Sequence, residues 1–134
     1  MTQRKNEMNI NLGLLIKIFL LLFFSFSIHG ETIEKNYALF KLLNKTTNKV
    51  SQKKISINQN IDWETLNIEV LYCASTKPTE IPEDYALVDV YDNINQEKIN
   101  IYRGWMISSL PSVTPLENPI YDLWLLDCIN DNDS

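Results

Sequence analysis

Residues 66–73 read LNIEVLYC, and this stretch decides the fold class. Its side chains alternate with a period of two residues, as they do in a half-buried β-strand. One side of the predicted strand carries Leu66, Ile68, Val70 and Tyr72, and the other carries Asn67, Glu69, Leu71 and Cys73. The stretch therefore predicts a strand with one face on a hydrophobic core.

The second half of the chain repeats this pattern. Residues 85–91 alternate strongly, and the turn-forming residues Asp92, Asn93, Asn95 and Gln96 precede another strand-like run at 98–105. This arrangement predicts a β-hairpin. Residues 121–128 (YDLWLLDC) then form an apolar run that predicts a terminal strand.

Residues 38–63 are less regular. The run 38–44 (ALFKLLN) suits a strand or a short helix, and the polar residues 45–54 suggest a connection. Ile55 and Ile57, a turn at 58–60 and residues 61–63 together suggest a second hairpin. Prolines predict loops at 76–83 and between Pro111 and Pro119. We therefore expect an all-β fold, a small single-domain sandwich or barrel of about six to seven short strands.

The N-terminus has the organisation of a signal peptide. Arg4 and Lys5 precede a run at 12–28 that is apolar except for a few residues such as Lys17, and Ser25, Ser27 and Gly30 supply small residues at its end. We predict a signal peptide at 1–30, a β domain at 31–129 and a polar, frayed tail at 130–134. An uncleaved membrane anchor is the alternative. The prediction places the protein in the periplasm, with membrane contact only through this segment before cleavage.

The predicted mature chain is acidic. Residues 31–134 contain 9 basic and 16 acidic residues, a net charge near −7, which argues against nucleic acid as a partner. Most of the basic residues cluster at 35–54, and acidic residues dominate afterwards. We interpret this polarity as two solvated faces, in preference to a binding patch.

Cys73 and Cys128 are the only cysteines. In an oxidising compartment their simplest state is a disulfide, which would close a loop of 55 residue steps. A zinc site is the weaker alternative because it needs four ligands, and the single histidine, His29, lies at the predicted cleavage point. We predict no metal and no cofactor.

Residues 104–128 read GWMISSLPSVTPLENPIYDLWLLDC, and residues 43–47 read LNKTT. With the Cys73 strand, these segments resemble the bacterial domain-of-unknown-function family 2155 (DUF2155), over about residues 39–128. The resemblance implies a small exported protein of alphaproteobacterial type without an established activity, and it supplies no catalytic residues. Members often have histidine where this chain has Asn118, which argues weakly against catalysis there.

We expect a noncatalytic module that binds an envelope protein or another envelope component. Its contact surface would lie at 104–124, where aromatic rings and hydrogen-bonding groups are dense. The candidate residues are Trp105, Ser108, Ser109, Glu117, Asn118, Tyr121 and Trp124. For each of the three aromatic rings we favour a position in the core, because the domain has few other large residues, and a surface position is the alternative.

Two other functions are weaker alternatives. A small-ligand or carbohydrate binder would use a pocket lined by Trp105 and Trp124. A hydrolase would need a base for Ser108 or Ser109, and residues 31–134 contain no histidine. Asp122 and Asp127, five residues apart on one predicted strand, would face opposite sides and could not act together. We therefore predict that the protein is not an enzyme.

Overall fold

The computed structural model describes residues 11, 13, 15–17, 19 and 31–132. Two compact units divide the chain, residues 1–30 and residues 31–134. In the first unit the described residues 13, 15–17 and 19 are helical. No helix among the described residues has the length and apolar character needed to cross a membrane. The predicted signal peptide lies mostly outside the described residues and stays a prediction.

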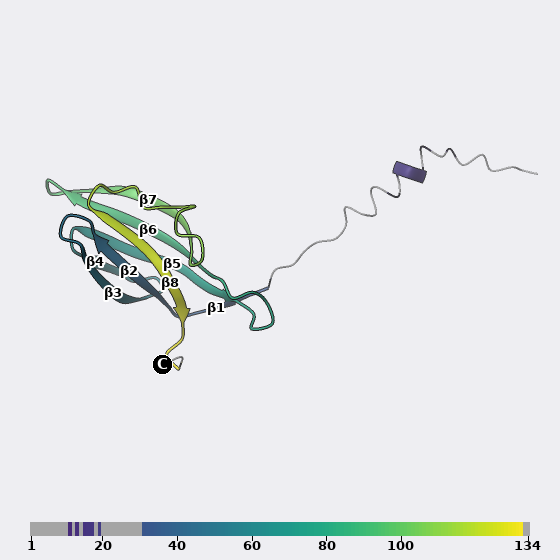
Figure 1. Ribbon diagram of the computed structural model, residues 1–134, viewed down its shortest axis with the longest axis horizontal. Helices are drawn as coiled ribbons and strands as arrows, with labels where there is room; N and C mark the ends of the chain where they lie inside the picture. The colour runs from purple at the N-terminus through teal and green to yellow at the C-terminus, as the bar shows by residue number, and fades with distance from the viewer. Residues whose placement is uncertain (1–10, 12, 14, 18, 20–30, 133–134) are drawn as a thin grey trace, which may run out of the picture. The chain divides into compact units, whose positions relative to one another are not determined.

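The second unit is an antiparallel β-sandwich, as expected (Figure 1). The large sheet has the order β1-β5-β6-β7, with β4 also paired to β5, and the small sheet has the order β3-β2-β8. The sheets do not close into a barrel, and residues 31–132 contain eight strands instead of the expected six to seven. The strands are β1 (Thr32–Glu34), β2 (Tyr37–Asn44), β3 (Lys49–Ser56), β4 (Asn60–Trp63), β5 (Leu66–Thr76), β6 (Asp84–Ile94), β7 (Glu97–Ile107) and β8 (Tyr121–Ile129).

One hydrophobic core lies between the two sheets. Phe40 and Leu42 enter it from the small sheet, and Ile68, Val70 and Val88 enter it from the large sheet. Each of these side chains is at most 1% exposed. Burying one such side chain stabilises the fold by about 1.5–3 kcal/mol, so this cluster contributes much of the free energy that holds the two sheets together.

The structure corrects two interpretations of the first half. Residues 38–44 lie in a strand, and most of the predicted connection 45–54 belongs to strand β3. Strand β3 lies at the edge of the small sheet, and Ile55 is its only buried residue, so it lacks an apolar alternation. The predicted hairpin at 55–63 is wrong, because β3 pairs with β2 whereas β4 pairs with β5. The chain changes sheets there, through Asn58 at a φ of 60°.

Two β-bulges reverse the expected direction of side chains. In β5 the pairing with β6 skips Leu71, so Val70 and Cys73 are both buried while Tyr72 turns to the outer face. In β8 the pairing with β2 skips Leu126, so Leu125 and Cys128 both face the core. A bulge adds one residue to one strand and thereby shifts the alternation by one. The prediction that Tyr72 shares the core face of Leu66, Ile68 and Val70 is therefore wrong.

The two bulges bring the cysteines together. Cys73 and Cys128 form a disulfide with a Cα–Cα distance of 5.7 Å, which confirms the predicted pairing. Their residues are 1% and 2% exposed. Without the bulges both cysteine side chains would point out of the sandwich, on opposite sides. The disulfide between the sheets therefore depends on the two bulges.

Candidate functional site

The outer face of the large sheet carries an aromatic groove. Tyr72, Leu87 and Trp105 are direct cross-strand neighbours on β5, β6 and β7. The adjacent row on the same face contains Ala74, Tyr85 and Ile107. The bulge at Leu71 gives Tyr72 its outward direction, so the same irregularity that places Cys73 in the core also builds this groove.

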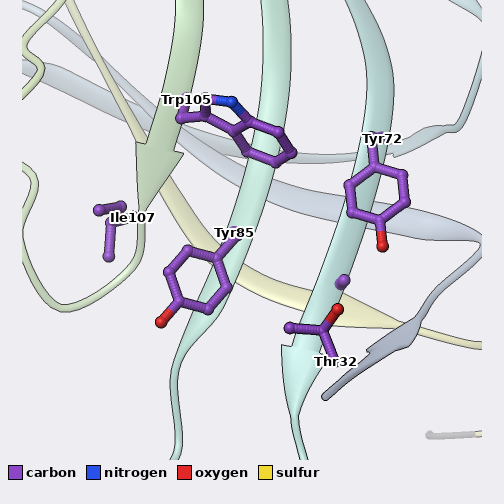
Figure 2. Close-up of a pocket in the computed structure, with 6 residues that line it drawn as sticks. Thr32, Tyr72, Tyr85, Trp105 and Ile107 are labelled. Atoms are coloured by element: carbon purple, nitrogen blue, oxygen red, sulfur yellow. The ribbon is translucent and has the colours of Figure 1, made fainter. Parts of the chain in front are cut away.

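Figure 2 shows the side chains that line the groove. Its volume is about 490 Å³, and its lining residues are Thr32, Tyr72, Ala74, Tyr85, Trp105 and Ile107. The rings of Tyr72 and Trp105 meet edge to face, with centroids 5.8 Å apart and an interplanar angle of 79°. Ala74 is fully buried, whereas Trp105 is 46% exposed. The groove thus offers the surface of a large aromatic side chain to a ligand.

An ion pair borders the groove on the side of Tyr72 and Trp105. Glu69, Asp89 and Arg103 form the next cross-strand row. Arg103 binds the Asp89 carboxylate with Nε and Nη2, and the Nε–Oδ1 distance is 2.6 Å. The hydrogen bond and the charge of Arg103 outweigh burial and lower the pKa of Asp89. The Asp89 side chain is 2% exposed and that of Arg103 is 68% exposed, so the guanidinium covers a buried carboxylate.

A hydrogen-bonded cluster lies at the other end, next to Tyr85. The Ser108 hydroxyl donates to Glu83 Oε1 at 2.9 Å, and the Ser109 amide donates to the same oxygen at 3.0 Å. The Ser109 hydroxyl donates to Glu83 Oε2. Burial alone would raise the pKa of Glu83, but these hydrogen bonds lower it below its usual value. The two serines therefore fasten the loop after β7 to the start of β6.

The predicted site residues do not form one surface. Trp105 lies in the groove, Ser108 and Ser109 lie in the cluster beside it, and Glu117 is exposed in the loop 108–120. Trp124 faces outward from the small sheet, opposite Lys41, whose Nζ lies 4.5 Å from the centre of the indole ring. Trp105 and Trp124 are therefore on opposite faces of the sandwich. The predicted pocket lined by both residues does not exist.

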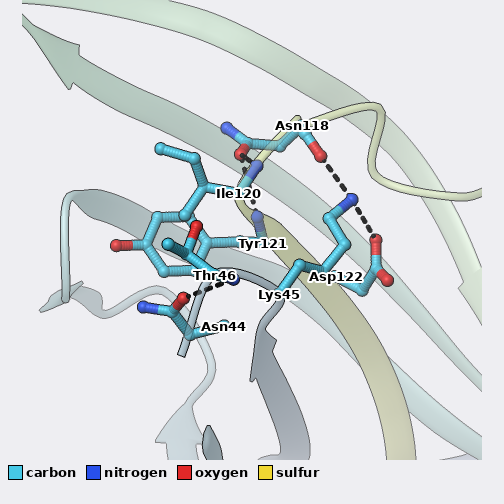
Figure 3. Close-up of polar contacts among 7 residues, drawn as sticks. All are labelled: Asn44, Lys45, Thr46, Asn118, Ile120, Tyr121 and Asp122. Carbon is cyan, nitrogen blue, oxygen red and sulfur yellow. Dashed lines mark hydrogen bonds and ion pairs between the residues drawn. The ribbon is translucent and has the colours of Figure 1, made fainter. Parts of the chain in front are cut away.

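Asn118 and Tyr121 are buried and support the fold instead of forming a contact surface. Tyr121 is 4% exposed and belongs to the core, so it cannot belong to a contact surface. Asn118 is 6% exposed, and its Oδ1 accepts hydrogen bonds from the amides of Ile120 at 2.8 Å and Tyr121 at 3.0 Å (Figure 3). Its Nδ2 donates to Asp92 Oδ2 at 2.9 Å. These contacts hold the end of the loop 108–120 against the end of the sandwich.

The two sequence segments 43–47 and 118–122 meet in space (Figure 3). Lys45 donates from its amide to the carbonyl of Ile120 at 2.7 Å, and its Nζ donates to the carbonyl of Asn118 at 2.7 Å. The same Nζ lies 3.0 Å from Asp122 Oδ1. Asn44 Oδ1 accepts from the amides of Thr46 and Thr47. Residues 43–47 and 118–122 therefore form one hydrogen-bonded contact that fixes the start of β8.

The predicted arrangement of Asp122 and Asp127 is wrong in detail. The bulge at Leu126 puts both carboxylates on the outer face of the small sheet, opposite Leu43 and Leu39 respectively. Five residues of strand still separate them by roughly 15 Å, which is too far for joint acid–base work. Within residues 31–132 no three metal-ligating side chains come together as a metal site.

Sequence reasoning missed Tyr72 and Tyr85, which complete the groove around Trp105. The period of two marks Tyr85 as a strand residue, but it gives no indication of which sheet face meets solvent. Tyr72 was hidden because the bulge at Leu71 shifts its alternation. The one available signal was the predicted disulfide. A cysteine that bonds to the opposite sheet must point into the core, so the aromatic residue directly before it must point outward.

The fold and the site together define a class: a disulfide-linked, two-sheet β-sandwich with an open aromatic groove on one outer face. The chain belongs to the family described as an uncharacterized protein conserved in bacteria (DUF2155), whose model matches residues 38–128. It is 26% identical over 97 residues to uncharacterized protein RP359 of Rickettsia prowazekii (strain Madrid E), a match that covers 70% of this chain and 63% of the relative. No solved structure matches the chain. The expected family is thus confirmed.

Proposed function

We propose that this protein is a noncatalytic binding module of the bacterial cell envelope. In this proposal residues 1–30 direct export, and the groove of the large sheet captures a protein partner in the periplasm. The single observation that carries the proposal is the position of Trp105, which is 46% exposed in a groove of about 490 Å³. Exposed aromatic residues set in a pocket are typical anchors of protein interfaces.

The loops at the end of the groove favour a protein over a sugar as the partner. Glu83 joins the loop 77–83 to the turn at Ser108 and Ser109, and the apolar side chains that these loops expose are Ile81, Leu110 and Val113. Ile81 is 87% exposed and Val113 is 61% exposed. Exposed apolar side chains in loops next to an apolar groove suit a protein interface. Thr32, Tyr72, Tyr85 and Trp105 carry polar groups, but the exposed lining of the groove is mostly apolar, which favours an apolar side chain over a sugar.

The surroundings of the serines support a noncatalytic role. Both the Ser108 and the Ser109 hydroxyls donate to the Glu83 carboxylate, and residues 31–134 contain no histidine that could act as their base. Serine nucleophiles depend on an adjacent base, which is most often a histidine. The two serines instead hold two loops in place beside the groove.

The test compares two tryptophan variants of the full-length chain, each expressed in a bacterium that carries the natural protein. Trp105→Ala should abolish in vivo crosslinking to the envelope partner, whereas Trp124→Ala should retain it, because the two rings lie on opposite faces. Thermal unfolding of both purified proteins serves as the control, and we expect Trp105→Ala to lose only about 1 kcal/mol because its ring is half exposed. Crosslinking that survives Trp105→Ala would overturn the proposal.

A further inference from the structure

We propose that the segment entering the groove is cationic: a short extended peptide with an apolar or aromatic anchor flanked by lysine or arginine. This inference rests on the proposed function and names the chemistry of its partner. The observations that carry it are the apolar lining of the groove and the sign of the charges around it.

One acidic flank comes from β1. Glu34 is the direct cross-strand neighbour of Ala74, so its side chain emerges on the same face as the lining residues. It is exposed. Within residues 31–132 Glu34 forms no ion pair, so its charge is available to a ligand at the β1 side of the groove.

Acidic groups also lie at both ends. Glu83 lies directly before β6, where it binds Ser109 in the loop after the lining residue Ile107, and the serine hydrogen bonds lower its pKa, so this carboxyl stays ionised. At the opposite end Glu69 is the cross-strand neighbour of Asp89. Arg103 is the cation on that row, and its Nε and Nη2 already bind Asp89. The row Glu69, Asp89 and Arg103 therefore keeps a net charge of −1.

The lysines are concentrated on two strands of the small sheet. Five of the nine basic residues in 31–134 belong to β2, β3 or the turn between them: Lys41, Lys45, Lys49, Lys53 and Lys54. The separation of basic from acidic residues along the sequence thus becomes a difference in charge between the two sheets. A surface of one sign attracts ligands of the opposite sign and repels those of its own sign, so the large sheet selects against anionic partners.

The size of the groove fits a few side chains. Sites of roughly 300–1,000 Å³ accommodate a drug-sized ligand, and about 490 Å³ lies within that range. The edge-to-face pair of Tyr72 and Trp105 forms one wall, which favours an aliphatic or aromatic anchor. Cations next to the anchor would meet Glu34 on one side and Glu69 or Glu83 at the ends.

The experiment measures binding of two labelled nonapeptides to the processed, exported protein by fluorescence anisotropy. Both peptides carry a central phenylalanine and leucine; one has two lysines on each side of this anchor and the other has two glutamates. We expect the lysine peptide to bind at least tenfold more tightly at low salt, with the difference shrinking as salt rises. Glu34→Gln and Glu69→Gln together should weaken lysine-peptide binding several-fold, whereas Glu97→Gln, at the far end of β7, should leave it unchanged.

The outcomes separate this inference from the proposed function. Equal binding of the two peptides, tighter binding of the glutamate peptide, or no effect of Glu34→Gln with Glu69→Gln would overturn the cationic partner. Displacement of the lysine peptide by a neutral oligosaccharide would also overturn it. The proposed function is judged by the crosslinking of Trp105→Ala, which uses no synthetic peptide, so a failure of the cationic partner can be distinguished from a failure of the proposed function.

Discussion

Asn118 joins three parts of the molecule through one amide group. Its Oδ1 satisfies the amides of Ile120 and Tyr121, and its Nδ2 reaches Asp92 on β6. We predict that Asn118→Ala lowers the free energy of unfolding by about 1–3 kcal/mol, because removing it leaves buried polar groups without partners. Urea unfolding measures this loss. Glu117→Ala, at the exposed neighbouring position, should change stability by less than about 0.5 kcal/mol; equal losses for the two variants would contradict the anchoring role.

The Asp89–Arg103 pair predicts a pH dependence. The pKa of Asp89 is lower in the folded protein than in the unfolded chain because Arg103 binds the charged carboxylate. The stability that this shift contributes is fully present above the unfolded-state pKa of about 3.9 and is lost as the pH falls through the folded-state pKa.

Asp89→Asn should therefore flatten the fall in stability below about pH 5 while leaving a residual slope from Glu83, whose pKa is also lowered. Urea unfolding between pH 6 and pH 3 measures the slope for each protein. Arg103→Gln should flatten it to a similar degree, and the double variant should add little to either single change. If the free energy of unfolding of Asp89→Asn fell with pH as steeply as that of the parent, the Asp89–Arg103 pair would not determine the loss of stability in acid.

At the scale of elements, the hairpin turn between β6 and β7 carries an unfavourable residue. Asn95 and Gln96 have φ angles of 52° and 70°, as in a type I′ turn, where asparagine followed by glycine is preferred. We predict that Gln96→Gly raises stability by about 0.5–1 kcal/mol because glycine adopts this conformation without steric cost. A rise in Tm of several degrees would confirm it. Asn93→Gly, within β6, should lower Tm, and a fall in both variants would argue against a strained turn.

Alternation in the sequence was enough to predict most strands but not their partners. The hairpin of β6 and β7 and the terminal strand β8 followed from residues 85–105 and 121–128, and the structure confirms both. Strand β3 was missed because its lysines face solvent at a sheet edge, where charged side chains discourage pairing with other chains. Its true neighbour is β2, and nothing local in residues 45–63 distinguishes that pairing from a hairpin with β4.

The candidate site was predicted only in part for a related reason. Trp105 and Tyr121 were candidates for either the core or the contact surface, and the structure places Trp105 at the surface and Tyr121 in the core. Tyr72 was assigned to the core face and lies on the outer face instead. A bulge such as the one at Leu71 changes the face of every later residue in its strand, yet a single inserted leucine leaves no distinct local pattern. The faces of a strand beyond a bulge become clear only once its partner is known.

At the scale of the whole molecule, the disulfide links the two sheets across 55 residues of chain. In the chain-entropy model such a loop stabilises the folded state by about 4 kcal/mol, a large share of the stability of a small domain. We predict that the Cys73→Ala, Cys128→Ala double variant loses most of this amount in urea unfolding. A double variant as stable as the parent would show that the sandwich does not depend on the crosslink.

The same architecture supports a prediction of where a signal peptide would be cleaved. Strand β1 begins at Thr32, and its backbone pairs with β5 from Thr76 to Ala74. Thr32 also lines the groove, so a cut beyond it would remove part of one wall. Cleavage after Gly30, beside the small residues that end the apolar run, leaves β1 complete.

We therefore expect N-terminal sequencing of the exported protein to begin at or next to Glu31, and fractionation to place that product in the periplasm. A matched experiment replaces Gly30 with a bulky residue, Gly30→Trp, which should slow processing and leave the longer form attached to the membrane, because signal cleavage needs small side chains at the site. A full-length product that stays in the membrane in the unaltered protein would instead identify residues 1–30 as an anchor. In that case the groove would act at the membrane surface, and its partner would have to be sought there.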